Sequence, residues 1–313
     1  MIKTYYKVGG IILLLTYEGR DYMDLKLDYI YQGDALEVLK TLPSESIDMC
    51  ITSPPYWNMR DYGVDGQLGL EYTVNEFIES LFNIFHEIKR VLKNEGSLWI
   101  NIRDTYSKGI KRSNVKNKSL CMIPERLIIK LLDDGWILRN DIIWHKPNAM
   151  PDSCKNRFTV DYEHLYFLTK IDKGYYFKTQ YEPFTTKHNR DSDFNNENDK
   201  RSKLLKTKIV RHGAEGSTLN SPSKWSEQGR IKRTTWSINT KSCKEAHFAT
   251  FPMDLIETPI DAGCPIGGIV LDPFMGSGTT GIVAKQQDKH YIGIELNPEY
   301  IEIANKRLGD MEK

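Results

Sequence analysis

Two short segments of this sequence contain residue types that could bind and activate a planar substrate. The first, Thr52-Ser53-Pro54-Pro55-Tyr56-Trp57, follows the strand-like run Ile47–Ile51. Prolines fix the backbone and have no N–H of their own, so the Pro54 carbonyl and the Ser53 hydroxyl could both accept hydrogens from one amino group. The Tyr56 ring offers a flat face. Read alone, the segment fits a Pro-Pro turn with a packed aromatic equally well.

The second segment is Leu271-Asp272-Pro273-Phe274-Met275-Gly276-Ser277-Gly278-Thr279-Thr280, which leaves a strand and enters a helix. Its glycines allow a ligand to approach the backbone, and the helix start offers unpaired N–H groups. No lysine follows Gly-Ser-Gly, and the glycine spacing is wrong for a dinucleotide fingerprint, so neither of those phosphate sites is indicated.

The strand Tyr291–Glu295 follows this glycine-rich turn and ends in a carboxylate. An acid in that position commonly accepts hydrogen bonds from ribose hydroxyls. The alternative, a surface glutamate at a strand end, is less favoured because Asn297-Pro298 starts a helix directly afterwards. A third acid, Asp34 in Tyr31-Gln32-Gly33-Asp34, also opens a helix, where a plain helix cap is at least as good an interpretation.

Hydrophobic periodicity predicts an alternating α/β protein that positions these segments. Alternation of strands with helices favours a mostly parallel sheet covered on both faces, with its active site at the carboxyl ends of the strands. The strands are expected at Tyr29–Tyr31, Ile47–Thr52, Ser97–Ile102, Ile137–Trp144, His164–Leu168, Ile269–Leu271 and Tyr291–Glu295. The helices are expected at Val74–Leu92, Ile123–Leu132, Met253–Ala262, Thr279–Gln287 and Pro298–Leu308.

Residues 185–245 interrupt this pattern with a polar, basic insertion. The chain of 313 residues has a net charge of +1, yet the insertion holds 14 Lys/Arg against 7 Asp/Glu. A basic segment on a mildly acidic body suggests a polyanionic partner, although a solvated linker has a similar composition. Hydrophobic residues at 40% and charged residues at 27% exclude collagen-like, mucin-like and wholly disordered chains.

Cysteine usage and hydropathy indicate a reducing cytoplasm. The five cysteines are odd in number, far apart and never in Cys-x-x-Cys spacing, which argues against a disulfide framework and a zinc site, so no metal is expected. No apolar run approaches the roughly 20 residues that span a bilayer. Val8–Leu15 is apolar but short and lacks a small-residue cleavage site, so a signal peptide is not expected. Residues 1–22 are expected to be a dispensable N-terminal extension, because Met23-Asp-Leu-Lys-Leu is followed at once by a strand-like run.

Together these motifs resemble the DNA amino-methyltransferases of bacterial restriction–modification systems. Asp272-Pro273-Phe274-x-Gly276-Ser277-Gly278-Thr279 is similar to their cofactor loop, and Ser53-Pro54-Pro55-Tyr56 to their catalytic tetrapeptide. The tetrapeptide precedes the loop, as in the permuted beta class. The resemblance covers about residues 28–184 and 246–308 and implies a Rossmann-like fold. It divides the chain into a catalytic half (23–184), a target-recognition region (185–245) and a cofactor-binding half (246–313).

The resemblance also implies roles for individual residues. Ser53, Pro54, Pro55 and Tyr56 would hold a flipped-out target base. S-adenosylmethionine would be bound by Asp34, Phe251, Asp272, Phe274, Gly276, Ser277, Gly278, Thr279 and Glu295. Double-stranded DNA would be contacted by Arg190, Arg201, Lys203, Lys206, Lys208, Arg211, Arg230, Lys232 and Arg233. A cognate restriction endonuclease and a homodimer are further expectations.

The residue types at the proposed catalytic positions exclude one kind of DNA methylation and favour another. Methylation of cytosine carbon 5 needs a Pro-Cys nucleophile, and no cysteine here follows a proline. Family members with serine at the first tetrapeptide position mostly methylate cytosine N4, whereas Asp or Asn more often accompanies adenine N6. Ser53 therefore favours cytosine N4, with adenine N6 as the alternative. A catalytically silent nucleic-acid-binding protein, or an RNA or protein methyltransferase, remains a more distant interpretation.

Overall fold

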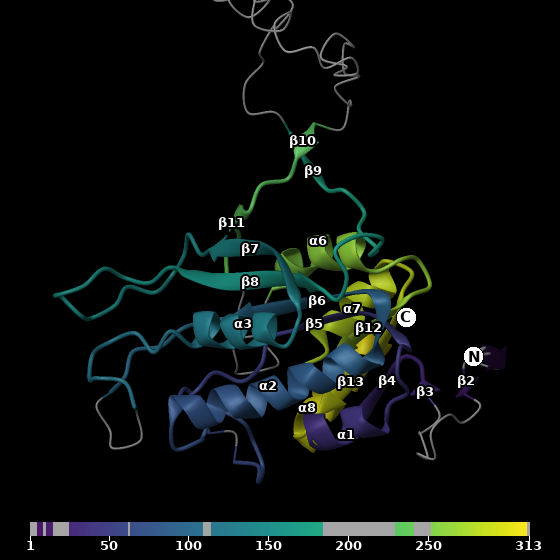
Figure 1. Ribbon diagram of the computed structural model, residues 1–313, viewed down its shortest axis with the longest axis horizontal. Helices are drawn as coiled ribbons and strands as arrows, with labels where there is room; N and C mark the ends of the chain where they lie inside the picture. Colours follow the sequence, from purple (N-terminus) through teal and green to yellow (C-terminus); the bar gives the residue numbers. More distant parts are fainter. Residues whose placement is uncertain are drawn as a thin grey trace, which may run out of the picture. The chain divides into compact units, whose positions relative to one another are not determined.

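The computed structural model of the chain describes residues 25–61, 63–108, 114–183, 229–240 and 252–311, and two further strands at 5–8 and 11–14 (Figure 1). The chain divides into two compact units. The main unit contains the described residues up to Lys178 and from Thr234 onwards, and the smaller unit spans Thr179–Arg233.

An eight-stranded sheet in the order β11-β7-β8-β6-β5-β12-β13-β4 forms the centre of the main unit. Every neighbouring pair is parallel except the two pairs that β8 forms with β6 and β7. The carboxyl ends of seven strands therefore share one edge with the amino end of β8. The strands are β4 (Tyr29–Gln32), β5 (Ile47–Thr52), β6 (Leu92–Ile102), β7 (Ile137–His145), β8 (Tyr162–Thr169), β11 (Thr235–Ser237), β12 (Ile269–Asp272) and β13 (His290–Glu295).

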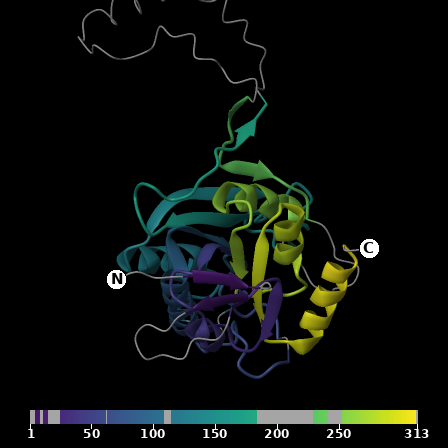
Figure 2. The same cartoon turned by 90° about the vertical axis from the view of Figure 1, so that its right-hand side faces the viewer.

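Helices cover both faces of this sheet, as the alternating pattern predicts (Figure 2). One face packs against α1 (Ala35–Thr41), α2 (Val74–Val91) and α3 (Ile123–Asp133), and the other against α6 (Met253–Gly263), α7 (Thr279–Gln286) and α8 (Pro298–Gly309). Adjacent strand residues belong to opposite cores: Val270 packs with the α6–α8 face, and Leu271 with the α1–α3 face. This alternation is the side-chain period of a strand buried on both sides.

The longest helix, α2, shows why the sequence folds in this way locally. Its apolar side chains recur every three or four residues, and Phe77, Leu81 and Phe85 are buried against the sheet. At its start Thr73 and Glu76 form a reciprocal capping box, which satisfies two backbone N–H groups that the first turn leaves unpaired.

The order of the sheet joins segments that are far apart in the sequence. β12 lies between β5 and β13, so a strand from near the end of the chain pairs with one from near its start. The Thr52 hydroxyl donates a hydrogen bond of 2.7 Å to Asp272 Oδ1 at the carboxyl ends of these two strands. The two segments predicted to carry chemistry are thereby placed next to each other.

The remaining strands differ from what the sequence pattern suggests. β1 (Tyr5–Val8), β2 (Ile11–Leu14) and β3 (Leu25–Lys26) form a small antiparallel sheet, so the expected N-terminal extension contains two strands. The smaller unit contains the antiparallel pair β9 (Tyr181–Glu182) and β10 (Arg230–Ile231).

Strand β11 lies within the basic insertion by sequence, yet it extends the main sheet. Its Trp236 is buried in the core beside α6, where its large apolar ring is removed from water. None of the helices in the described part of the chain is long and apolar enough to cross a membrane. Cys50, Cys121, Cys154 and Cys264 are free thiols, and Cys243 lies outside the described residues.

Candidate active site

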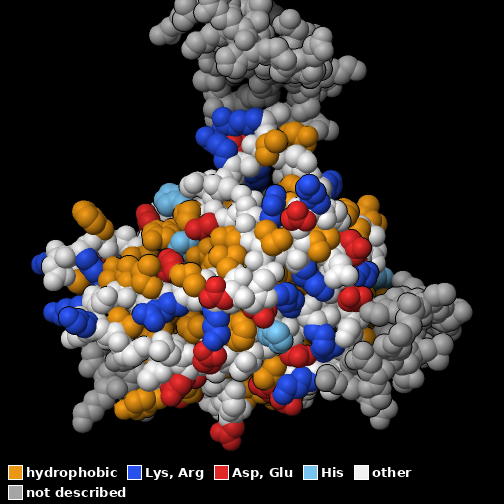
Figure 3. Space-filling view, viewed as in Figure 1, with side chains coloured by type: hydrophobic (Ala, Val, Ile, Leu, Met, Phe, Trp, Pro, Cys, Tyr) orange, Lys and Arg blue, Asp and Glu red, His pale blue; other side chains and the backbone are white. Residues whose placement is uncertain are grey.

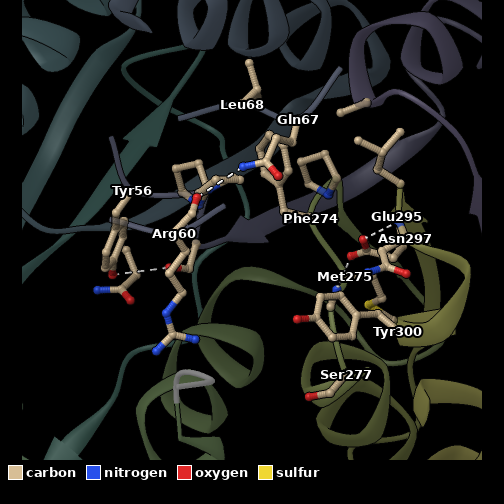
Figure 4. Close-up of a pocket in the computed structure, with 18 of the residues that line it drawn as sticks. Tyr56, Arg60, Gln67, Leu68, Phe274, Met275, Ser277, Glu295, Asn297 and Tyr300 are labelled. Atoms are coloured by element: carbon tan, nitrogen blue, oxygen red, sulfur yellow. Dashed lines mark hydrogen bonds between the residues drawn. The ribbon is translucent and has the colours of Figure 1, made fainter. Parts of the chain in front are cut away.

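A cavity of about 320 Å³ opens at the carboxyl edge of the sheet (Figure 4). Segments that follow four parallel strands contribute to its wall: Gly33–Ala35 after β4, Ser53–Tyr56 after β5, Pro273–Ser277 after β12 and Glu295–Asn297 at the end of β13. The two motifs singled out from the sequence therefore face one space. Of the predicted site residues, Asp34, Ser53, Pro54, Pro55, Tyr56, Phe274, Gly276, Ser277, Thr279 and Glu295 line it.

The Ser-Pro-Pro-Tyr corner forms one wall. The Ser53 hydroxyl lies 3.4 Å from the Tyr56 hydroxyl, which itself donates to Glu163 Oε2 at 2.8 Å. Burial, together with the nearby Glu163 carboxylate, raises the pKa of Tyr56 well above its usual value, so the phenol stays protonated and acts as a donor. The neighbouring Trp57 is buried in the core and its indole N–H donates to the Glu71 carbonyl, so this ring packs the interior and does not line the cavity.

Glu163 is the centre of a polar network that the sequence did not reveal. Its side chain is almost fully buried and accepts hydrogen bonds from Tyr56, from Asn101 Nδ2 at 3.1 Å and from Lys146 Nζ. The Lys146 ammonium also lies 4.1 Å from the centre of the Trp144 ring. Burial lowers the pKa of Lys146, although Glu163 opposes that shift. The network gives the cavity one fixed anion and one fixed cation beside the Ser-Pro-Pro-Tyr corner.

Sequence signals could have found some of the missed residues. Asn101 and Lys146 lie at the carboxyl ends of the parallel strands β6 and β7, where polar side chains face an active site. Glu163 lies near the start of β8, and only the antiparallel direction of that strand brings it to the same edge.

Glu295 holds the glycine-rich loop at the opposite wall. Its Oε2 accepts the Gly276 N–H at 2.7 Å, and its Oε1 accepts the Asn297 N–H at 2.9 Å. Burial raises the pKa of Glu295, while the hydrogen bonds from these two backbone N–H groups act to lower it. Figure 4 shows Glu295 and Asn297 together on this wall with Tyr300 close by.

Gly276 leaves room for a ligand at this wall. It has a φ of +50°, and a Cβ built on it would meet nothing closer than the Phe274 carbonyl oxygen at 3.9 Å. Gly278 differs because its Cβ would lie 2.9 Å from Ala304 Cβ on α8. Gly278 therefore serves helix packing and does not line the cavity.

Asp272 lies behind the loop and not on the cavity wall. It is fully buried and accepts hydrogen bonds from the hydroxyls of Thr52 and Thr280 and from the Phe274 N–H. Burial raises the pKa of Asp272 to about 6, and these three donors limit the rise. Its position indicates that it shapes the glycine loop and fastens it to the Ser-Pro-Pro-Tyr corner.

Asp34 lines the cavity and also caps a helix, so the two interpretations of this acid are compatible. Its Oδ1 accepts the Glu37 N–H at 3.0 Å at the start of α1. The cap fixes the carboxylate at the mouth of the site.

The residues expected to contact DNA fall mostly outside the described residues. Those residues are Arg190, Arg201, Lys203, Lys206, Lys208 and Arg211, and the cofactor candidate Phe251 is likewise outside. In the smaller unit Arg230 and Arg233 both donate to Glu182 Oε1, at 2.7 and 2.8 Å. Burial lowers the pKa of Lys232.

Comparison with known proteins decides the family. The profile of the N6/N4 methyltransferases, described as DNA methylase, matches residues 47–306. The chain belongs to the N6/N4 DNA methylase family. Type II methyltransferase M.Cfr9I of Citrobacter freundii is 42% identical to this methylase over 299 residues, covering 89% of this chain and 87% of the relative. M.SmaI of Serratia marcescens is 36% identical, covering 89% and 90%.

Solved structures show the same fold. PvuII DNA methyltransferase (cytosine-N4-specific) superposes on the methylase with a TM-score of 0.61 at 21% identity, covering 90% of both chains. A putative DNA modification methylase of Thermus thermophilus, complexed with S-adenosyl-L-methionine, has a TM-score of 0.56 at 25% identity and covers 90% of this chain and 94% of its own. The predicted Rossmann-like methyltransferase fold is confirmed.

The methylase is therefore a DNA amino-methyltransferase of the restriction–modification kind, with S-adenosylmethionine as its methyl donor. The family and the cofactor predicted from the sequence are confirmed. The residues present fit that donor: the open Cβ position at Gly276 leaves room for a ligand against the backbone, and the buried Glu295 carboxylate lies beside it. Carboxylates in this position accept ribose hydroxyls.

Proposed function

We propose that this methylase modifies the exocyclic N4 of a cytosine that is extruded from duplex DNA into the cavity. The observation that carries the proposal is the shared cavity, in which the Ser-Pro-Pro-Tyr corner faces the glycine loop and Glu295. The choice of cytosine rests on Ser53, because family members with serine at this position mostly act on N4. Adenine N6 is the alternative outcome of the test below.

Asp34, Gly276, Ser277 and Glu295 would hold S-adenosylmethionine, with Phe274 beside it. When bound, its sulfonium supplies an electrophilic methyl group. Asp272 contributes indirectly, because it fixes the loop that carries Phe274 and Gly276. The Glu295 carboxylate also has a structural role in this wall of the cavity. It accepts the Gly276 N–H and so holds the glycine-rich loop next to the end of β13.

The Ser-Pro-Pro-Tyr corner activates the target amine. That amine is a poor nucleophile because its lone pair is delocalised into the ring. The Ser53 hydroxyl oxygen and the Pro54 carbonyl accept its two N–H hydrogens and draw the nitrogen toward a tetrahedral geometry. The lone pair would then point at the methyl carbon that the bound donor supplies, and the methylated nitrogen would lose its extra proton to water as the carbon–sulfur bond breaks. Alignment of two bound reactants contributes up to roughly 7–11 kcal/mol in favourable cases.

Tyr56 holds the extruded base by stacking. A base inside a duplex cannot reach this cavity, and its extrusion costs a few kcal/mol. Stacking on an aromatic ring returns about 1–3 kcal/mol per base. The hydrogen bond from Tyr56 to Glu163 holds the ring in one orientation, so the stacking surface exists before the base arrives.

The DNA contacts from the basic residues of 185–245 stay a prediction, as do a homodimer, a cognate endonuclease and a cytoplasmic location. Phosphate contacts of that kind are sequence-blind and weaken with salt.

The function is tested by expressing the chain in cells that lack other DNA methylases. Genomic DNA is digested to nucleosides, analysed by mass spectrometry and sequenced with modified-base detection. We expect N4-methylcytosine at one recurring sequence, and a much smaller methylated fraction of those sites with the variant Ser53→Ala combined with Tyr56→Ala. N6-methyladenine in its place would contradict the cytosine assignment, and unmodified DNA would contradict the function.

A further inference from the structure

The loop between β7 and β8, residues 146–161, carries two strongly exposed apolar side chains. Phe158 is 95% exposed and Met150 is 88% exposed. Single exposed apolar residues are ordinary, but two on one loop next to an active site suggest a contact surface.

Phe158 is held outward by a well-connected loop. Asp152 accepts hydrogen bonds from the Cys154 N–H at 2.9 Å and from Arg157 Nη2 at 2.6 Å. At the base of the loop the Lys146 N–H donates to the Asp161 carbonyl at 2.7 Å. The guanidinium of Arg157 also lies 3.6 Å from the centre of the Tyr106 ring, which fastens the loop to the segment after β6. The exposed ring therefore sits on a preorganised support.

This loop borders the catalytic cavity. Lys146 lines the cavity itself. Arg157 and Val160 line a neighbouring hollow, whose wall also includes Met59 and Arg103. Met59 and Arg103 line both spaces, so the hollow and the cavity are contiguous along the carboxyl edge of the sheet.

The surface around the loop is basic. Residues 103–108, 114–120 and 146–162 contain seven Lys/Arg and three Asp/Glu. Two of the three acids are engaged locally: Asp104 accepts the N–H groups of Met122 and Ile123, and Asp152 pairs with Arg157. Figure 3 shows basic and apolar side chains together at the end of the main unit where this loop projects in Figure 1. This combination fits a nucleic acid, whose phosphates meet the cations and whose bases meet the apolar groups.

We propose that the β7–β8 loop docks on the DNA beside the extruded base, and that Phe158 inserts into the base stack to fill the space the base has left. Apolar wedges of this type support a distorted duplex because they replace lost stacking contacts. Lys118, Lys155 and Arg157 contact the flanking phosphates. The inference rests on the proposed base extrusion, and it adds a DNA contact outside the basic residues expected at 190–233.

The test compares Phe158→Ala with Ile266→Ala in the full chain. Ile266 is also strongly exposed, at 82%, but it precedes β12 and so lies at the opposite edge of the sheet. Single-turnover methylation is measured on the duplex identified by modified-base sequencing and on the same duplex with an abasic site opposite the target base. The abasic partner makes extrusion easy, so the wedge becomes dispensable.

We expect Phe158→Ala to slow methylation of the paired duplex at least tenfold and that of the abasic duplex less than twofold. Ile266→Ala should leave both rates within twofold of the wild type. A Phe158→Ala rate within twofold of the wild type on the paired duplex would overturn the inference, as would an equal loss on both duplexes. In both of these results the wild type still methylates the duplexes. If the proposed function is wrong, the wild type itself methylates neither duplex, and the inference fails with it. The two failures are therefore distinguishable.

Discussion

The Tyr56 hydroxyl donates a hydrogen bond of 2.8 Å to Oε2 of Glu163, which lies 107 positions later in the chain. This bond joins the Ser-Pro-Pro-Tyr corner to β8, the strand that runs against both of its neighbours. Because Glu163 also accepts hydrogen bonds from Asn101 and Lys146, one buried carboxylate fixes the Tyr56 ring and a cation in the same wall.

Removing either partner of this bond should slow methyl transfer about tenfold, because the ring loses its fixed orientation. Single-turnover rates of Tyr56→Phe, Glu163→Gln and the double variant form a double-mutant cycle. We expect the double variant to be clearly faster than the product of the single losses predicts. The exposed Glu302→Gln on α8 is the control. Strictly multiplicative losses would show that the hydrogen bond has no such role.

Ser53→Ala should reduce the methyl-transfer rate about five- to tenfold, since one acceptor of an amine hydrogen is lost and such a bond contributes about 1 kcal/mol. Calorimetric titration with S-adenosylmethionine should give an unchanged dissociation constant. If Ser53→Ala methylated DNA at the wild-type single-turnover rate, the hydroxyl could not have the proposed activating role.

Glu295→Gln should weaken S-adenosylmethionine binding roughly 10- to 100-fold, because hydrogen bonds to a charged acceptor contribute about 1.5–3 kcal/mol. The carboxylate also holds the Gly276 N–H, so the loop loses a support at the same time. Glu299→Gln, an exposed residue in the first turn of α8, is the matched control. Equal affinities in wild type and Glu295→Gln would contradict the assignment of the ribose site.

Two glycines in the cofactor loop should respond differently to alanine. At Gly278 the new Cβ meets Ala304 at 2.9 Å and the φ of +82° is strained, so we expect a clear loss of unfolding free energy, on the order of 2–3 kcal/mol. At Gly276 the Cβ enters open space, so the variant should lose less stability but bind the methyl donor more weakly. Urea denaturation and cofactor titration measure the two effects. Equal destabilisation with equal affinity would refute the distinction.

Asp272 should make the stability of the protein pH-dependent. Burial raises the pKa of its carboxyl to about 6, above the value of about 3.9 expected in an unfolded chain. The folded state therefore binds more protons between these values, and its stability falls as pH rises through that window. Relative to Asp272→Asn, the wild type should lose up to about 3 kcal/mol between pH 4 and pH 7, measured by urea denaturation. The exposed Asp65→Asn is the control, and a pH-independent difference for Asp272→Asn would contradict the prediction.

The sequence predicted most of the sheet because its strands are short apolar runs between helices. β5 was predicted with its observed bounds, Ile47–Thr52, and α2 to within one residue. β11 was missed because three residues within a polar insertion give no periodic signal, although its Trp236 is buried. The direction of β8 was not predicted either, because side-chain alternation is the same in parallel and antiparallel strands.

The sequence predicted those site residues that have a suitable side chain or are glycine and also follow the carboxyl end of a parallel strand. Ser53 directly follows β5, Glu295 ends β13 and Gly276 lies in the loop after β12, and all three line the cavity. Asp272 also lies at a strand end but is buried in the interior, because the hydroxyls of Thr52 and Thr280 donate hydrogen bonds to its two carboxylate oxygens. The contribution of Glu163 depends on strand direction, which only the folded chain reveals.

The pairing of β5 with β12 also has a consequence for synthesis on the ribosome. Until residues 269–272 emerge, the nascent chain has β5 and β6 but not the strand that completes their sheet, and the hydroxyl of Thr52 lacks its acceptor. Because long-range pairing of this kind is slow to form, the cavity between the two motifs can assemble only after residues 269–272 have emerged. A product that terminates before residue 269 would leave one edge of β5 unpaired and would lack the glycine-rich wall of the cavity.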